Sequence, residues 1–148
     1  MYSNGKKGYF KYQQTDVLTL SSVEIIDRLL KAMCSDIERA AGAMERGDMA
    51  SKGERITRAI AIAGELQASL NFEDGGEIAE KLNALYDYMI RELLMANLKN
   101  DKKRLEGVKA VLMPIIEAWQ QVVTHHKNHQ PIERANQAES VKQVQTAL

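Results

Sequence analysis

The sequence predicts an all-α protein, an antiparallel four-helix bundle, and three observations lead to this fold class. Apolar residues recur at three- and four-residue steps along four consecutive stretches of similar length. Aromatic residues make up only 5% of the 148 residues and there are only two prolines, which disfavours an all-β fold. Short connections rich in Gly, Asn and Asp separate the stretches, so successive helices are expected to run antiparallel.

The first two predicted helices span residues 21–44 and 49–70. Ser21 followed by Glu24 has the pattern of a capping box, and Gly47 with Asp48 ends the first helix. The turn-rich residues 71–76 end the second. The two apolar stripes consist of Val23, Ile26, Leu30, Met33, Ile37, Ala41 and Met44 in the first helix and of Ile56, Ile60, Ala63, Leu66 and Leu70 in the second.

The third and fourth predicted helices span residues 77–98 and 102–123, with Asp101 as the N-cap of the fourth. The third helix has an apolar arc that is wider than one bundle core needs. Either an amphipathic helix from a partner covers part of this arc, or the arc faces two neighbouring helices. Its two adjacent stripes are Ile78, Leu82, Leu85, Met89, Leu93 and Ala96, and Ala79, Tyr86, Ile90, Leu94 and Leu98.

The predicted organisation is a flexible N-terminal arm at residues 1–20, a helical bundle at 21–124 and a mobile polar tail at 125–148. Aromatic side chains in the arm are expected either to fold over an exposed apolar groove or to belong to a disordered leader. The tail carries an i, i+4 histidine pair that could bind a transition metal if the helix continues that far, although solvated histidines near a helix C-terminus are the favoured interpretation. The histidines are His125, His126 and His129.

Several classes of function are disfavoured. Lys+Arg and Asp+Glu both total 20, so no excess of positive charge is available for nucleic acid. No stretch approaches the roughly 18 apolar residues of a membrane span, so we expect a soluble cytoplasmic protein without membrane insertion. Cys34 is the only cysteine, which excludes an internal disulfide. No catalytic constellation or cofactor motif is present, and no carboxylate or cysteine completes a metal site with the histidine pair, so we expect neither catalytic residues nor cofactors.

Residues 9–123 resemble the FliS family of flagellin-specific export chaperones, most strongly between Asn71 and Trp119. The family pattern is followed in order and spacing by Gly75-Gly76-Glu77-Ile78-Ala79, Leu82, Leu85-Tyr86-Asp87-Tyr88, Ala96-Asn97, Asp101, Leu105, Val108, Leu112 and Ala118-Trp119. The resemblance implies a cytoplasmic four-helix bundle that binds the disordered C-terminal segment of flagellin, keeps it from polymerising and delivers it to the flagellar type III export apparatus. Export-gate components are further expected partners.

On this basis we predict a protein-binding surface and a core. The surface consists of Tyr86, Ile90, Leu94 and Asn97 with Ile25, Leu29 and Ile62, and the arm residues Tyr9, Phe10 and Tyr12 are expected to cover part of it until flagellin binds. The core is expected to contain Trp119, Leu82, Leu85 and Leu112. The protein is expected to be a monomer or a weak homodimer. Two alternatives stay open, a self-associating structural or adaptor bundle and a small helical enzyme.

Overall fold

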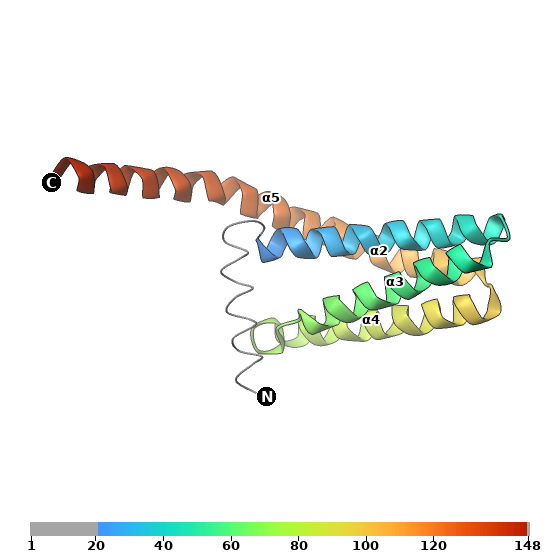
Figure 1. Cartoon of the computed structure of the whole chain (residues 1–148). Coiled ribbons are helices and arrows are strands. Elements are labelled where there is room, and N and C mark those ends of the chain that lie inside the picture. The colour runs from blue at the N-terminus through green and yellow to red at the C-terminus, as the bar shows by residue number, and fades with distance from the viewer. Residues whose placement is uncertain (1–20, 148) are drawn as a thin grey trace, which may run out of the picture. The chain divides into compact units, whose positions relative to one another are not determined.

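The computed structural model describes the backbone of residues 21–147 and the side chains of residues 21–129. Four helices occur in this region, α2 (Ser22–Glu45), α3 (Met49–Ala68), α4 (Phe72–Lys99) and α5 (Lys102–Ala147) (Figure 1). Residues 21–147 contain no strand. The predicted all-α class is therefore confirmed. The chain divides into two parts: the helical body, Ile25–Glu117, and the terminal part, which combines the described residues of Met1–Glu24 and Ala118–Leu148.

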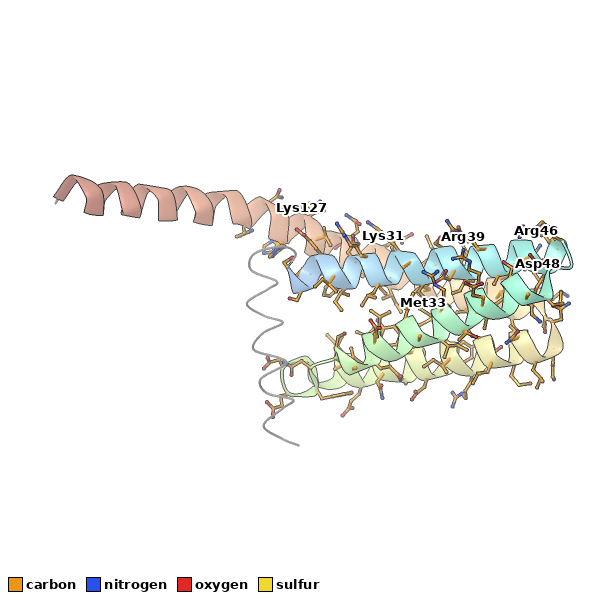
Figure 2. The ribbon with its side chains drawn as sticks, in the orientation of Figure 1. Lys31, Met33, Arg39, Arg46, Asp48 and Lys127 are labelled. Carbon is orange, nitrogen blue, oxygen red and sulfur yellow. The ribbon has the colours of Figure 1, made fainter. Side chains whose placement is uncertain are left out.

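A tight connection reverses the chain between α2 and α3. Gly47 adopts φ 70°, which allows the Asp48 N–H to donate to the Ala43 carbonyl at 2.9 Å and the Gly47 N–H to the Met44 carbonyl at 3.1 Å. The Asp48 carboxylate then accepts a hydrogen bond from the Ser51 N–H at 3.1 Å (Figure 2). One short segment thus satisfies the end of α2 and the start of α3, as the sequence predicts.

Replacing Gly47 by Ala should lower the free energy of unfolding by about 1 kcal/mol, because a side chain at positive φ is strained. No atom lies within 4 Å of a Cβ built on Gly47, so the cost is backbone strain and not a clash. Gly64 is the matched control, since its Cβ also meets nothing within 4 Å while its backbone is helical. Gly64→Ala should stabilise by about 0.5 kcal/mol. Urea unfolding measures both, and changes of the same sign would contradict this account.

Both ends of α4 are defined by short-range hydrogen bonds. Asn71 accepts from the Asp74 N–H at 3.1 Å and starts a first helical turn, which Gly76 interrupts at φ 48°, ψ −122°. The regular helix resumes at the predicted start after this glycine. At the other end Asn100 is left-handed at φ 51°, and the Asp101 N–H donates to Ala96 at 3.0 Å. Asp101 also accepts from the Lys103 N–H at 3.1 Å, which confirms it as an N-cap of α5.

All four helices contribute to the core of the helical body. The largest fully buried side chains are Leu30, Met33 and Ile37 of α2, Ile56 and Leu66 of α3, Met89 and Leu93 of α4, and Leu105, Val108 and Leu112 of α5. Met33, labelled in Figure 2, lies on the inward face of α2. Burial of a side chain of this size contributes about 1.5–3 kcal/mol relative to exposure, so these residues dominate the stability of the body.

Pairwise contacts connect the helices of the body at their surfaces. α3 packs along α4 (Figure 1). Arg55 of α3 contacts Asp36 of α2 at 3.2 Å. Two further ion pairs at 2.9 Å connect α2 with α5 and α4 with α5, namely Glu38–Lys109 and Glu92–Arg104. The helical body is thus a four-helix bundle.

The prediction that the last helix ends near Val123 was wrong. α5 is 46 residues long and continues through Pro114 and Thr124 to Ala147. The sequence beyond Thr124 contains no glycine and many Gln, Ala, Glu and Lys residues, which favour helix without producing an apolar stripe. Apolar periodicity therefore missed this extension. The predicted mobility of residues 125–148 stays a prediction.

Two hydrogen bonds order the terminal part. Ser21 Oγ accepts from the Glu24 N–H at 3.2 Å, which confirms the predicted cap of α2. Trp119 Nε1 donates to the Val23 carbonyl at 2.9 Å, so the first turn of α2 has a direct link to α5. Among the described helices, none combines the length and the apolar character that crossing a bilayer requires.

Candidate protein-binding surface on α4

One apolar stripe of α4 passes from the interior to the surface. Tyr86 is 4% exposed, Ile90 is half-buried, Leu94 is 54% exposed and Leu98 is 78% exposed. These residues are four apart, and because the helix has 3.6 residues per turn, each step rotates the side chain by about 40°. The stripe therefore winds around α4 and places two leucines in solvent. We call Ile90, Leu94 and Leu98 the α4 surface stripe.

Tyr86 does not belong to this exposed surface. Burial raises the pKa of its phenol above the ordinary value and leaves 4% of the residue accessible. A residue this enclosed offers a partner almost no contact area in the free chain, and the binding role of Tyr86 stays a prediction. Tyr86 instead packs in the interior of the body, where an aromatic ring contributes a large apolar area.

Asn97 lies where α3 meets the last turn of α4. Lys52 of α3 is 7% exposed, and its Nζ donates to the Asn97 carbonyl at 3.0 Å. The last carbonyls of a helix lack partners within the helix and carry partial negative charge, so a buried ammonium group is favourable there. The Asn97 amide oxygen points toward Gly53, whose added Cβ would be 4.0 Å away. The half-buried Asn97 thus borders the α4 surface stripe beside α3.

The predicted residues of α2 and α3 form a separate group. Ile25, Leu29 and Ile62 are all half-buried. The Arg55–Asp36 ion pair fixes the relative level of α3 and α2. Ile62 follows Arg55 by about two turns, and Leu29 precedes Asp36 by about two turns. Because α2 and α3 run antiparallel, Leu29 and Ile62 lie at the same level of the two helices.

α3 separates this group from the α4 surface stripe. Ile62 follows Gly53 by nine residues, which is about two and a half turns, so the two residues lie on opposite sides of α3. Gly53 faces Asn97 of α4, whereas Ile62 lies on the side that faces α2. The structure therefore brings Ile90, Leu94 and Asn97 together, and places Ile25, Leu29 and Ile62 elsewhere. Tyr9, Phe10 and Tyr12 lie outside the described residues, and their covering role stays a prediction.

Other exposed apolar residues were not placed on the surface by sequence reasoning. Leu98 belongs to the α4 surface stripe, while Ile78, Leu85 and Tyr88 are 71%, 38% and 41% exposed. Leu85 was predicted to be in the core and is not, whereas Leu112 is fully buried as predicted; Leu82 and Trp119 are half-buried. Leu85 precedes Leu94 by nine residues, or about two and a half turns, so it lies on the opposite side of α4, which therefore has a second exposed apolar flank. The one feature of the sequence that indicated exposed apolar residues on this helix was the width of its apolar arc.

Cys34 has the environment of a packing residue and not of a nucleophile. Its Sγ lies 3.9 Å from Met113 Sδ and 3.8 Å from Glu38 Oε1. Burial, and then the negative charge of Glu38, raise the pKa of the thiol. A raised pKa reduces the thiolate fraction, which is the reactive form of cysteine.

Comparison with known proteins decides the family. Residues 5–126 match the model of the family described as flagellar protein FliS. The chain belongs to the FliS family. This match confirms the family resemblance that is strongest between Asn71 and Trp119. The matched region ends before the last 21 residues of α5.

FliS relatives cover most of this chain. The flagellar secretion chaperone FliS of Salmonella typhimurium is 42% identical over 125 residues, which are 82% of this chain and 93% of the relative. FliSB of Pseudomonas aeruginosa is 37% identical over 117 residues, covering 76% and 93%. The relatives are secretion chaperones, so this FliS-family chain is a chaperone and not an enzyme, as predicted.

A solved structure supports the fold independently. The crystal structure of a bacterial flagellar chaperone superimposes with a TM-score of 0.67, covering 82% of this chain and 98% of that one, at 15% identity. At this identity the likeness concerns the fold, and it agrees with the helical bundle described above.

Proposed function

We propose that this FliS-family protein is a cytoplasmic chaperone that binds the disordered C-terminal segment of flagellin, prevents its premature polymerisation and assists its export by the flagellar type III secretion system. The observation that carries the proposal is the α4 surface stripe, whose Leu94 and Leu98 are 54% and 78% exposed. Neighbouring apolar side chains on a helix surface mark a site for a partner that covers them.

Binding is expected to order the client. A disordered segment that folds as an amphipathic helix can bury its own apolar face against the α4 surface stripe, and the entropy of ordering consumes part of the gain. Burial of Leu94 and Leu98 contributes about 1.5–3 kcal/mol each when complete. The export-gate components predicted as further partners belong to the same proposal.

Leu94→Asp should weaken binding of a synthetic flagellin C-terminal peptide by about tenfold or more, because it removes apolar contact and adds a charge that must be desolvated. Leu85→Asp is the matched control, since it makes the same change on the other exposed flank of α4. Isothermal titration calorimetry measures both affinities. Wild-type protein that does not bind the peptide would contradict the function, whereas binding that Leu94→Asp leaves unchanged would contradict only its placement on the α4 surface stripe.

Self-association is a second candidate, favoured by the presence of two exposed apolar flanks on α4. A second copy that covers one flank would make the protein a homodimer. Light scattering with and without the flagellin peptide distinguishes the candidates: dissociation of a dimer by peptide supports the chaperone, and a dimer that persists with peptide supports the structural role.

A further inference from the structure

The extension of α5 places two histidines next to each other on an exposed helix face. His125 and His129 are one helical turn apart, and both are exposed. Their ring centroids lie 4.2 Å apart, with the ring planes tilted by 41°. The two rings can lie side by side only if the helix continues beyond Thr124. α5 does so, because it extends to Ala147. Two imidazoles at this spacing are the arrangement by which a helix presents two nitrogens to one metal ion.

A hydrogen bond fixes the state of one ring. His129 Nδ1 lies 3.0 Å from the carbonyl oxygen of His125. A carbonyl oxygen can only accept, so Nδ1 carries the proton and the lone pair of a neutral His129 ring is on Nε2. Metal-binding histidines characteristically donate their second ring N–H to a backbone carbonyl or carboxylate, which orients the ring and leaves the other nitrogen for the metal. His129 is held in this way before any metal is present.

We propose that His125 and His129 form a bidentate site for a divalent first-row transition metal of the kind that imidazole prefers, such as Cu²⁺, Ni²⁺ or Zn²⁺. Two nitrogens bound to one such ion at about 2.0–2.1 Å lie about 3 Å apart, which rings with centroids 4.2 Å apart reach by small side-chain rotations. No group of three or more His, Cys, Asp or Glu ligands occurs in the described residues, so the proposed site consists of these two protein ligands and leaves the other coordination positions open to solvent.

The third histidine provides an internal control. His126 follows His125 by one residue and therefore faces about 100° away around the helix. It is half-buried, and its Nε2 is enclosed without a hydrogen-bond partner among the described residues. A hydrated ion has no access to this nitrogen. His126→Gln thus removes the same chemical group from the same turn without touching the pair.

Titration of tag-free full-length protein with NiCl₂ alone tests the site. Wild-type protein should bind one Ni²⁺ saturably, and His125→Gln and His129→Gln should each weaken binding by about tenfold or more, because one imidazole cannot chelate. His126→Gln should bind as the wild type does. Absence of saturable binding, unchanged affinity in both pair variants, or an equal loss in all three variants would overturn the proposal. Far-UV circular dichroism verifies that each variant keeps its helix content.

A second measurement needs no variant. Substoichiometric Cu²⁺ is paramagnetic and should broaden the ring-proton resonances of His125 and His129 in the wild-type NMR spectrum while leaving those of His126 sharper. Broadening of all three to the same extent, or of none, would contradict a site built from the pair.

Discussion

Leu93→Ala is expected to lower the free energy of unfolding by about 3 kcal/mol, the largest effect of any change considered for this protein. Leu93 is 0% exposed and lies on the side of α4 that faces the other helices. Truncation removes its buried apolar area and leaves a cavity that the surrounding side chains fill only in part. Urea unfolding monitored by circular dichroism measures the change.

Leu98→Ala is the control for this prediction, because it makes the same substitution in the same helix at a residue that is 78% exposed. A side chain that is already in water loses little on truncation, so the stability should change by less than about 0.5 kcal/mol. A Leu98 variant as unstable as the Leu93 variant would show that something covers Leu98 in the free protein. Equal and small effects would show that the core is not packed as described.

Arg55→Met should destabilise the protein by about 2 kcal/mol, because it leaves a buried carboxylate without its hydrogen bond. Asp36 is 3% exposed, and its Oδ1 accepts from Arg55 Nη1 at 3.2 Å. The other oxygen, Oδ2, has no hydrogen-bond partner within the described residues. The loss of Arg55 thus deprives Asp36 of the one hydrogen bond that the described region gives it. Chemical denaturation at constant ionic strength measures the effect.

Arg58→Met provides the comparison. Arg58 Nε lies 3.7 Å from Asp36 Oδ2, and the Arg58 side chain is 57% exposed. Solvent screens such a pair, so its loss should cost less than about 0.5 kcal/mol. If the two arginine variants were equally destabilised, long-range charge attraction and not the single hydrogen bond would be the relevant interaction.

Local sequence signals were sufficient to locate most of the helix ends. Ser21, Gly47 and Asp101 each act at a helix end in the way that their side chains or backbone predict. The apolar stripes also identified much of the core, including Leu30, Met33 and Ile37 of α2. These features depend on a few neighbouring residues, so they can be inferred without knowing the tertiary arrangement.

Which of the predicted binding residues are exposed depends on information that apolar periodicity does not contain. Tyr86 and Leu94 lie on one stripe in the sequence, yet Tyr86 is buried and Leu94 is exposed. The stripe winds around α4, so its later residues turn away from the neighbouring helices. Likewise Asn97 of α4 meets the side of α3 that carries Gly53, whereas Ile62 lies on the opposite side of α3. Which side of a helix meets which neighbour is a property of the packed bundle.

The winding of Tyr86, Ile90, Leu94 and Leu98 also constrains how a client helix can lie on α4. Side chains four residues apart form a ridge inclined by about 26° to the helix axis, and a second helix that fits a similar ridge into the adjacent groove crosses at about −50°. A client docked on Leu94 and Leu98 in this manner therefore crosses α4 obliquely and meets it over a few turns only. Its anchoring residues are then expected at four-residue intervals, and any longer client must bend away and continue over another face.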